Sequence, residues 1–298
     1  MRRVFKWVLR GLVALVGLLA IAGLALVLQA RRKPAEPPIY VALGSSYAAG
    51  AGLTPLRRGG PLLCAQGSSG YPSLLAAKLG LPLVDMACGG AVTRHLLVGG
   101  QFLQRAQIDV IDSRTRLVTI TVGGNDVGYV GDLSLLAARR STTLFGRATR
   151  WLWHGPRSER DWSQLRADLG ATVRAVHARA PNAQIVLATY PRVLPSQGTC
   201  ARLGLGEDEA TAMRRVAAHM ASINADVAAE TGALLVDMDA RGLGHDACST
   251  SPWTNGWWDV GTGAPFHPTA AGARATADAI LAALNRAHTV DVGRPAPA

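Results

Sequence analysis

Five short apolar runs recur along the chain, and several of them are rich in β-branched residues. They occupy residues 39–44, 83–86, 117–122, 184–190 and 233–237. Each is short enough to be a buried strand, and turn residues or helical patterns follow it. Strand and helix alternate over about 250 residues, which predicts one doubly wound, three-layer α/β domain with a five-stranded, mostly parallel sheet.

Helical periodicity fills the spaces between these runs. Residues 71–79 are expected to be a helix that leads into the second strand. Asp161-Trp-Ser-Gln164 resembles a capping box, and we expect the helix that it opens to end before Pro181. A further helix should follow the acidic residues 207–209 and close at Gly232. Two sets of apolar residues recur at helical spacing and are expected to face the core: Leu165, Leu169, Val173 and Val176, then Met213, Val216, Met220, Ile223 and Val227.

The N-terminus carries the longest apolar stretch. The twenty residues from Gly11 to Ala30 hold no charge, with four basic residues before them and Arg31-Arg32-Lys33 after them. At about 1.5 Å per residue they span a hydrocarbon core of about 30 Å. A cleaved signal peptide usually has an apolar region of about 7 to 15 residues and small residues before the cut, and Leu28-Gln29-Ala30 is a poor cleavage site.

This stretch sets the expected domain organisation. Residues 1–33 form a signal anchor with one transmembrane helix, 34–38 a proline-containing linker, 39–288 the catalytic domain and 289–298 a disordered tail. We expect a single-pass protein of the cell membrane with its catalytic domain extracytoplasmic. If the N-terminal segment is cleaved, the protein is secreted instead.

Much of the net charge of +11 comes from the N-terminal segment. Residues 1–33 hold seven basic and no acidic residues, which leaves 24 basic against 20 acidic residues in the remainder. No basic stripe with interleaved aromatic residues is present. The composition therefore does not favour nucleic-acid binding, and the only macromolecular partner it indicates is the membrane.

The four cysteines indicate an oxidising compartment. They form no Cys-x-x-Cys pair and no His/Cys cluster, so no metal site is expected. An even number of cysteines behind an export segment favours two disulfides, for which three pairings exist. The alternative is four buried free thiols. The cysteines are Cys64, Cys88, Cys200 and Cys248.

A candidate nucleophile follows the first predicted strand. Gly44 ends that strand and is followed by Ser45 and Ser46. In open α/β sheets, sites lie at the carboxyl ends of the strands, where backbone amides are free to bind an anion. A serine hydroxyl is a weak nucleophile near neutral pH, so an acyl-transfer site also needs a base and oxyanion donors.

Three further stretches can supply these groups. They are Met86-Ala-Cys-Gly-Gly-Ala-Val-Thr93, Val122-Gly-Gly-Asn-Asp126 and Pro265-Phe-His-Pro-Thr269. Gly90 offers an unobstructed amide, and the side-chain amide of Asn125 is a neutral donor suited to an oxyanion. His267 precedes Pro268, a helix-starting residue, and a helix N-terminus disfavours imidazolium, which keeps the ring a free base.

Taken in this order, the four stretches resemble the SGNH hydrolases, the GDSL esterase and lipase family, over residues 39–288. The resemblance implies a flavodoxin-like fold and a serine ester hydrolase without cofactor or metal. It implies Ser46 as nucleophile, His267 as base, and the amide of Ser46 with Gly90 and Asn125 as oxyanion donors. It also implies the disulfides Cys64–Cys88 and Cys200–Cys248. Related extracellular esterases often carry a further cysteine pair after Gly-Gly-Asn-Asp; this chain does not, so that segment must be held otherwise or move.

Two positions depart from the family pattern. Ser45 stands where an Asp usually precedes the nucleophile, which places two adjacent hydroxyls in competition. Ala264 stands where an Asp usually orients the base, although some members use a backbone carbonyl there. Asp259 and Asp246 are possible substitutes, while His245 is expected to be structural in a disulfide-bearing loop.

The sequence therefore predicts a serine ester hydrolase, an esterase or lipase that acts on acyl esters through an acyl-enzyme. Two alternatives stay open. Envelope glycans or lipids could be the acyl donor or acceptor, which would make the protein an acyltransferase or deacylase. The departures at Ser45 and Ala264 would also fit a catalytically inactive ligand-binding domain of the envelope.

Overall fold

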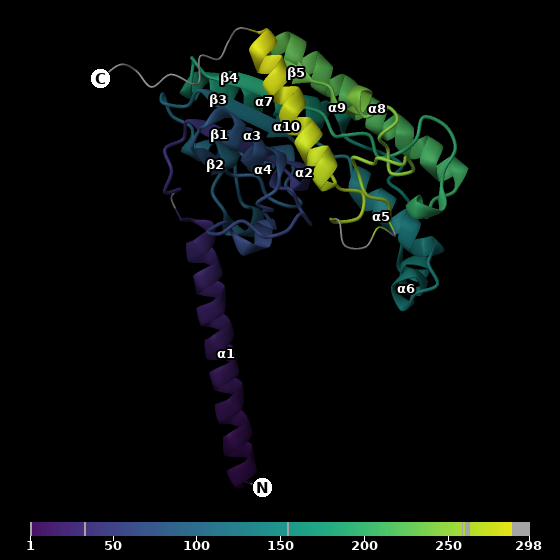
Figure 1. Cartoon of the computed structure of the whole chain (residues 1–298). Coiled ribbons are helices and arrows are strands. Elements are labelled where there is room, and N and C mark those ends of the chain that lie inside the picture. Colours follow the sequence, from purple (N-terminus) through teal and green to yellow (C-terminus); the bar gives the residue numbers. More distant parts are fainter. Residues whose placement is uncertain (1, 33, 154, 258, 260–262, 288–298) are drawn as a thin grey trace.

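The computed structural model describes residues 2–32, 34–153, 155–257, 259 and 263–287. Its centre is a five-stranded sheet in the order β2-β1-β3-β4-β5, with every pair of neighbours parallel (Figure 1). The strands are β1 (Tyr40–Gly44), β2 (Leu83–Asp85), β3 (Leu117–Thr121), β4 (Gln184–Ala188) and β5 (Leu234–Val236). The predicted doubly wound sheet is confirmed, and the last four strands end one or two residues earlier than predicted.

Helices cover both faces of the sheet. The core is split accordingly: α3 and α10 pack under one face, whereas α4, α5, α7 and α8 pack on the other. The helices are α1 (Arg2–Ala30), α2 (Ser46–Ala49), α3 (Tyr71–Leu79), α4 (Thr93–Leu97), α5 (Tyr129–Arg140), α6 (Leu144–Leu152), α7 (Trp162–Arg179), α8 (Glu207–Thr231), α9 (Met238–Arg241) and α10 (Ala270–Arg286). Short 3-10 turns are η1 (Leu62–Cys64), η2 (Gln101–Leu103), η3 (Gln107–Val110) and η4 (Ala201–Leu203).

The local signals that predicted the long helices have the expected physical roles. The side chain of Asp161 accepts a hydrogen bond from the Gln164 amide at 2.8 Å, so it caps α7. That helix ends at Arg179, two residues before Pro181. Gly232 closes α8 in the left-handed conformation, with φ of 73°. All the apolar positions predicted to face the core from these two helices are buried.

The segment after Gly-Gly-Asn-Asp forms α5 and α6 and is held without a disulfide. Arg160, which follows α6, forms an ion pair with Asp132 of α5 at 2.7 Å, and both side chains are less than a tenth exposed. Arg160 also donates a hydrogen bond to the carbonyl of Val127. Because a buried ion pair is costly to break once one partner is removed, this contact ties the end of the segment to its beginning.

Helix α1 leaves the domain as a separate rod (Figure 1). Within it, the 21 residues Leu9–Gln29 are long and apolar enough to cross a membrane. Three hydrogen bonds join its C-terminal end to loops of the domain. Gln29 donates to the carbonyl of Gly60 at 3.1 Å, Arg31 to the carbonyl of Leu103 at 3.1 Å, and Arg105 to the carbonyl of Arg31 at 2.6 Å. The predicted tail, 289–298, lies outside the described residues.

Both disulfides have the pairing that the family resemblance implied. Cys64 of η1 is bonded to Cys88 after β2, and Cys200 before η4 is bonded to Cys248. The first links η1 to the turn that contains Gly90, and the second closes the loop around His245. The imidazole of His245 stacks on Trp253 at 4.3 Å, as expected for a structural residue.

Candidate active site

The turn after β1 is shaped by Gly44. Its φ is 144°, and a Cβ atom there would lie 2.2 Å from the carbonyl oxygen of Thr121, so a side chain is excluded. The side chain of Gln107 accepts a hydrogen bond from the Gly44 amide at 2.8 Å and donates one to its carbonyl at 3.0 Å. This clamp fixes the chain as it leaves the sheet, and Ser46 then begins α2 at the carboxyl edge.

Ser46 and His267 meet across 221 residues of sequence. The Oγ atom of Ser46 lies 2.8 Å from Nε2 of His267, whose other ring nitrogen, Nδ1, lies 2.8 Å from the carbonyl oxygen of Pro265. A carbonyl can only accept, so Nδ1 carries the hydrogen and Nε2 is the acceptor for the serine hydroxyl. Ser46 is 8% exposed, so it is buried but not fully removed from solvent.

Burial controls the protonation of His267. Loss of hydration lowers the pKa of its imidazole below the usual 6.5, and the hydrogen bond to the Pro265 carbonyl opposes this shift less strongly. The ring is therefore neutral at neutral pH. A neutral imidazole with a free acceptor nitrogen 2.8 Å from a hydroxyl is suited to act as a general base.

The residue after Ser46 holds the loop that carries the histidine. The hydroxyl of Tyr47 donates a hydrogen bond to the carbonyl of Phe266, which has a left-handed backbone with φ of 59° and no exposed side-chain surface. The Tyr47 ring stacks on Tyr190 with 3.8 Å between centroids and lies 5.1 Å from the His267 ring. Tyr47 thus contacts both the imidazole of His267 and the backbone of the residue before it.

Ser45 faces a different partner. It is fully buried, and its hydroxyl forms a hydrogen bond of 2.7 Å with the hydroxyl of Tyr190. The Tyr190 oxygen also accepts a hydrogen bond from the Gly124 amide at 3.2 Å. Of the two adjacent serines, only Ser46 therefore reaches His267 in this structure.

The candidate oxyanion donors lie on three neighbouring turns. The amide groups of Ser46 and Gly90 have no acceptor among the described residues, and Gly90 has a φ of 80° that favours glycine. The side-chain amide of Asn125 donates one hydrogen to the carbonyl of Ala91 at 2.9 Å, which joins it to the Gly90 turn. Gln101 of η2 donates to the carbonyl of Gly89 at 2.7 Å and supports the same turn.

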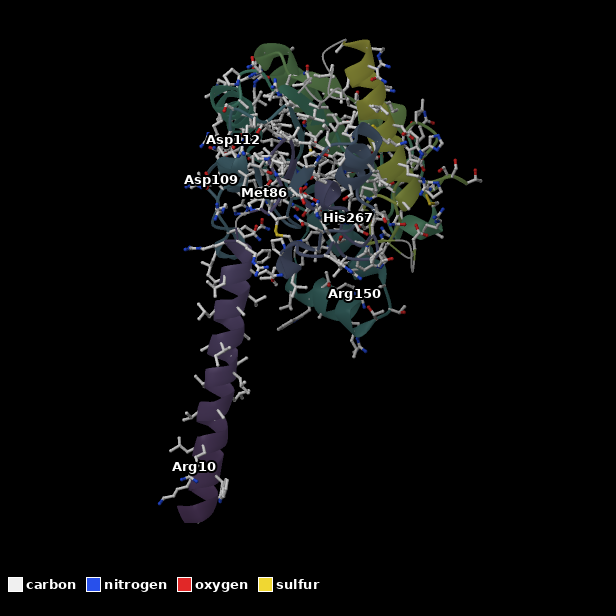
Figure 2. The ribbon with its side chains drawn as sticks, turned by 60° about the vertical axis from the view of Figure 1, so that its left-hand side comes forward. Arg10, Met86, Asp109, Asp112, Arg150 and His267 are labelled. Carbon is white, nitrogen blue, oxygen red and sulfur yellow. A yellow bond between two sulfur atoms is a disulfide. The ribbon has the colours of Figure 1, made fainter. Side chains whose placement is uncertain are left out.

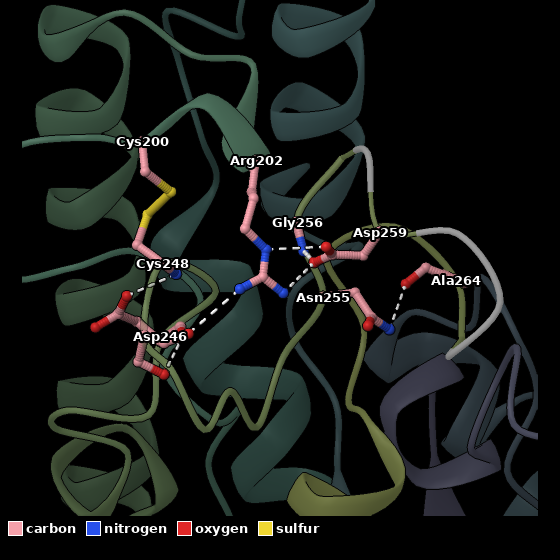
Figure 3. A network of polar contacts seen from close by, with 9 residues as sticks. Cys200, Arg202, Asp246, Cys248, Asn255, Gly256, Asp259 and Ala264 are labelled. Atoms are coloured by element: carbon pink, nitrogen blue, oxygen red, sulfur yellow. Dashed lines mark hydrogen bonds and ion pairs between the residues drawn. A yellow bond between two sulfur atoms is a disulfide. The ribbon is translucent and has the colours of Figure 1, made fainter.

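Both aspartates considered as substitute acids are bound to other groups (Figure 3). Asp259 forms a two-pronged ion pair with Arg202, with distances of 2.9 and 3.0 Å. Asp246 accepts a hydrogen bond from the amide of Cys248 at 2.9 Å. The orienting group is instead the carbonyl of Pro265, the residue after Ala264. Among the residues that the structure describes, no three His, Cys, Asp or Glu side chains form a group that could hold a metal ion.

Sequence reasoning did not single out four residues of this site: Tyr47, Gln101, Gln107 and Tyr190. One of them carried a usable signal, because Tyr190 closes a predicted strand and so had to lie at the same edge as Ser46. The two glutamines carried none, since their contacts depend on where distant loops return to the sheet.

A parallel sheet with a serine, a neutral histidine and free amides at its carboxyl edge defines the class of serine hydrolases with an α/β fold. Comparison with known proteins gives the family. The model of the GDSL-like lipase/acylhydrolase family matches residues 42–275, and the chain belongs to this family. It is a carboxylic ester hydrolase that acts on acyl esters.

Relatives from Streptomyces support this assignment. Lipase 1 of Streptomyces coelicolor is 32% identical over 87% of this chain and 92% of its own length. The crystal structure of an extracellular lipase from Streptomyces rimosus is similar, with a TM-score of 0.63 and 30% identity over 83% of this chain and 98% of the other. The phospholipase A1 of Streptomyces albidoflavus NA297 has a TM-score of 0.64 with the same identity and coverage.

Proposed function

We propose that the protein is a membrane-anchored, extracytoplasmic lipid esterase whose nucleophile is Ser46 and whose general base is His267. The supporting observation is the hydrogen bond of 2.8 Å between Ser46 Oγ and His267 Nε2, on a ring whose tautomer is set by the Pro265 carbonyl. Residues 39–288 form the catalytic domain in this proposal, and residues 1–33 form the anchor.

The reaction proceeds through an acyl-enzyme. Ser46 Oγ attacks the ester carbonyl while His267 Nε2 takes its proton, and the C–O bond of the leaving alcohol breaks as His267 returns that proton to the alcohol oxygen. Water then attacks the acyl group, again losing its proton to Nε2. The acid is released, and Ser46 regains its hydrogen.

Three donors stabilise the negative charge that forms on the carbonyl oxygen. They are the amides of Ser46 and Gly90 and the second hydrogen of the Asn125 side chain, whose first hydrogen is bound to Ala91. The donors are in place before the reaction, and such preorganised donors contribute most when charge develops. Gln101 and Gln107 act as positioning residues, because each holds the backbone of one of these turns.

The relatives and α1 support the proposed substrate class and location. Curated and solved relatives are named as lipases and as a phospholipase A1. Helix α1 contains a membrane-crossing length of apolar residues, with four basic residues before its uncharged stretch. The two disulfides fit an oxidising compartment. An uncleaved α1 places the hydrolase at the outer surface of the membrane, where lipid esters are the nearest substrate.

Single-residue variants of the two serines test the mechanism. Ser46→Ala should lower kcat for a water-soluble ester by at least about 10⁴-fold and abolish labelling by a fluorophosphonate. Ser45→Ala is the matched control, because it removes a hydroxyl that binds Tyr190 and should retain the labelled adduct. Wild-type labelling of Ser46→Ala would overturn the assignment of the nucleophile.

A further inference from the structure

The exposed apolar side chains of the domain are concentrated in three segments. Outside α1, ten large apolar side chains are exposed among the described residues, and nine of them lie in residues 56–63, 98–103 and 144–152. We call these three segments the apolar rim. Its exposed apolar members are Leu56, Leu62, Leu63, Val98, Phe102, Leu103, Leu144, Trp151 and Leu152, and the tenth exposed residue, Leu243, lies elsewhere.

Two segments of the rim surround the point where α1 leaves the domain. Helix α1 packs against η2, and Arg31 just after it donates a hydrogen bond to the carbonyl of Leu103. Gln29, within its last turn, donates to the carbonyl of Gly60, which lies within residues 56–63. A helix able to cross the membrane therefore ends among outward-facing leucine and phenylalanine side chains.

The loop that carries Phe102 and Leu103 is strained. Both residues have a left-handed backbone, with φ of 48° and 60°, and both are about half exposed. The left-handed region is unfavourable for bulky residues. The strained backbone and the exposure of these apolar side chains to water both cost free energy. An apolar environment outside the domain would explain why the chain tolerates both costs.

The third segment is an amphipathic helix. Leu144, Trp151 and Leu152 of α6 are 82%, 81% and 64% exposed, and Arg147 and Arg150 of the same helix are exposed as well. Figures 1 and 2, which differ by a rotation about the vertical axis, both show α6 on the side of the domain from which α1 leaves. Figure 2 places Arg150 on that side, beyond His267. Exposed Trp and Leu beside Arg are typical of a helix that lies in a membrane interface.

We infer that the apolar rim is a membrane-docking surface that seats the domain in the lipid interface, with the active-site edge turned toward the bilayer. The occupant is a bilayer that contains anionic lipids, because basic residues lie within the first and third segments and next to the end of α1, which packs against the second. Exposed Arg58 belongs to the first segment, Arg32 lies near the end of α1, and Arg147 and Arg150 lie on α6, whereas Arg57 is already paired with Asp85. Each basic residue near an anionic surface contributes about 1 kcal/mol to membrane binding.

The rim is joined to the catalytic turn by short connections. The Cys64–Cys88 disulfide links η1, which carries Leu62 and Leu63, to the residue two positions before Gly90. Gln101 precedes Phe102 and donates to the carbonyl of Gly89. Seating the rim in the interface therefore places the turn that holds Gly90 near the ester groups of membrane lipids. This step rests on the proposed hydrolase function.

The test uses the full-length protein in vesicles of phosphatidylcholine and phosphatidylglycerol. Two activities are measured: hydrolysis of a vesicle-embedded long-chain ester and of a water-soluble short-chain ester. The rim variants are Phe102→Asn with Leu103→Asn, since Asn tolerates a left-handed backbone, and Trp151→Gln with Leu152→Gln. Leu243→Asn is the matched control, because Leu243 is 65% exposed, within the range of the substituted rim residues, and lies outside the rim.

Each rim variant should lower kcat/KM for the embedded ester by at least about tenfold. The reason is that insertion of one Leu or Phe side chain into the bilayer stabilises binding of the protein to the vesicle by an amount that corresponds to at least this factor. Hydrolysis of the soluble ester should stay within about twofold of the parent, and Leu243→Asn should change neither activity. Equal losses on both esters, or no loss on the embedded ester, would overturn the docking surface.

Nitroxide labels give a second readout that does not depend on activity. No described cysteine is free, so a label can be attached to a single introduced cysteine at position 19, 103, 151 or 243. Labels at 103 and 151 should be accessible to oxygen and shielded from a water-soluble nickel complex, and the label at 243 should show the reverse. Nickel access at 103 and 151 would refute the surface, whereas nickel access at 19 would refute the anchor. If the unsubstituted protein does not hydrolyse the soluble ester, the proposed function is refuted instead.

Discussion

The hydrogen bond from Tyr47 to the Phe266 carbonyl predicts that Tyr47→Phe will damage catalysis by displacing His267. The substitution removes one oxygen atom and keeps the ring that stacks on Tyr190. Tyr47 is 2% exposed, so the carbonyl it leaves behind has little access to water. An unsatisfied buried acceptor costs about 1 to 3 kcal/mol.

The cost of leaving this carbonyl unsatisfied is similar to the strain energy of the Phe266 backbone, which the hydrogen bond from Tyr47 holds in place. Phe266 has a left-handed backbone, which for a bulky residue costs on the order of 1 to 3 kcal/mol. Without the hydrogen bond, the loop can relax toward an ordinary conformation and carry His267 away from Ser46. A displacement of about 1 Å at reacting groups can cost about 100-fold in rate, so we expect kcat to fall about 10- to 100-fold with little change in KM.

Tyr40→Phe is the matched control. Tyr40 is fully buried, and its hydroxyl forms a hydrogen bond of 3.0 Å with Thr119, but it begins β1 and lies at the opposite end of that strand from Ser46. Both variants should lower the free energy of unfolding by about 1 to 2 kcal/mol, measured by urea unfolding in detergent. Only Tyr47→Phe should lower kcat for a soluble ester. Equal effects of the two variants on kcat, or an unchanged kcat in Tyr47→Phe, would refute the reasoning.

Two further predictions concern the group that orients His267. Ala264→Asp should not raise kcat, because Nδ1 of His267 is already bound to the Pro265 carbonyl at 2.8 Å; an increase of more than about threefold in steady-state assays would mean that this carbonyl is not sufficient. The acid limb of kcat/KM for a soluble ester should have its midpoint below pH 6.5, because burial lowers the pKa of His267 and activity is lost only as pH falls through that lowered pKa. A midpoint at or above 6.5 would contradict a neutral base whose pKa is lowered by loss of hydration.

Much of the fold could be predicted because its strands and long helices have strong local patterns. The residues of β3 are apolar or β-branched and are all buried, and the face of α7 repeats at helical spacing behind a capping residue. Helices α5 and α6 were not predicted. An isolated helix of 9 or 12 residues is unstable, so its formation depends on tertiary contacts. Helix α6 also leaves its apolar residues exposed, so it has no core-facing pattern to detect.

The candidate site, too, contains residues that local motifs predict and groups that they do not. The motifs placed Ser46, Gly90, Asn125 and His267 on turns at one edge of the sheet, and the structure brings Ser46 and His267 into hydrogen-bond contact. The orienting group could not be read from side chains, because a backbone carbonyl is present at every position and only the local bend selects Pro265. For Ser45, the sequence placed Tyr190 at the same edge, at the end of a predicted strand, but a strand pattern does not show which hydroxyl its side chain meets.

The use of a neutral carbonyl in place of a carboxylate changes what the site requires of its geometry. A carboxylate beside the imidazole both fixes the tautomer and stabilises the imidazolium that forms during the reaction. The Pro265 carbonyl fixes the tautomer but contributes only a dipole, and burial disfavours the charged ring further. The base is therefore available at lower pH, but proton transfer to it is less favourable. Without a carboxylate charge to stabilise the imidazolium, a displaced ring loses more of its activity. We therefore infer that the rate depends on how firmly the loop holds His267. Tyr47 supplies the contact that holds this loop.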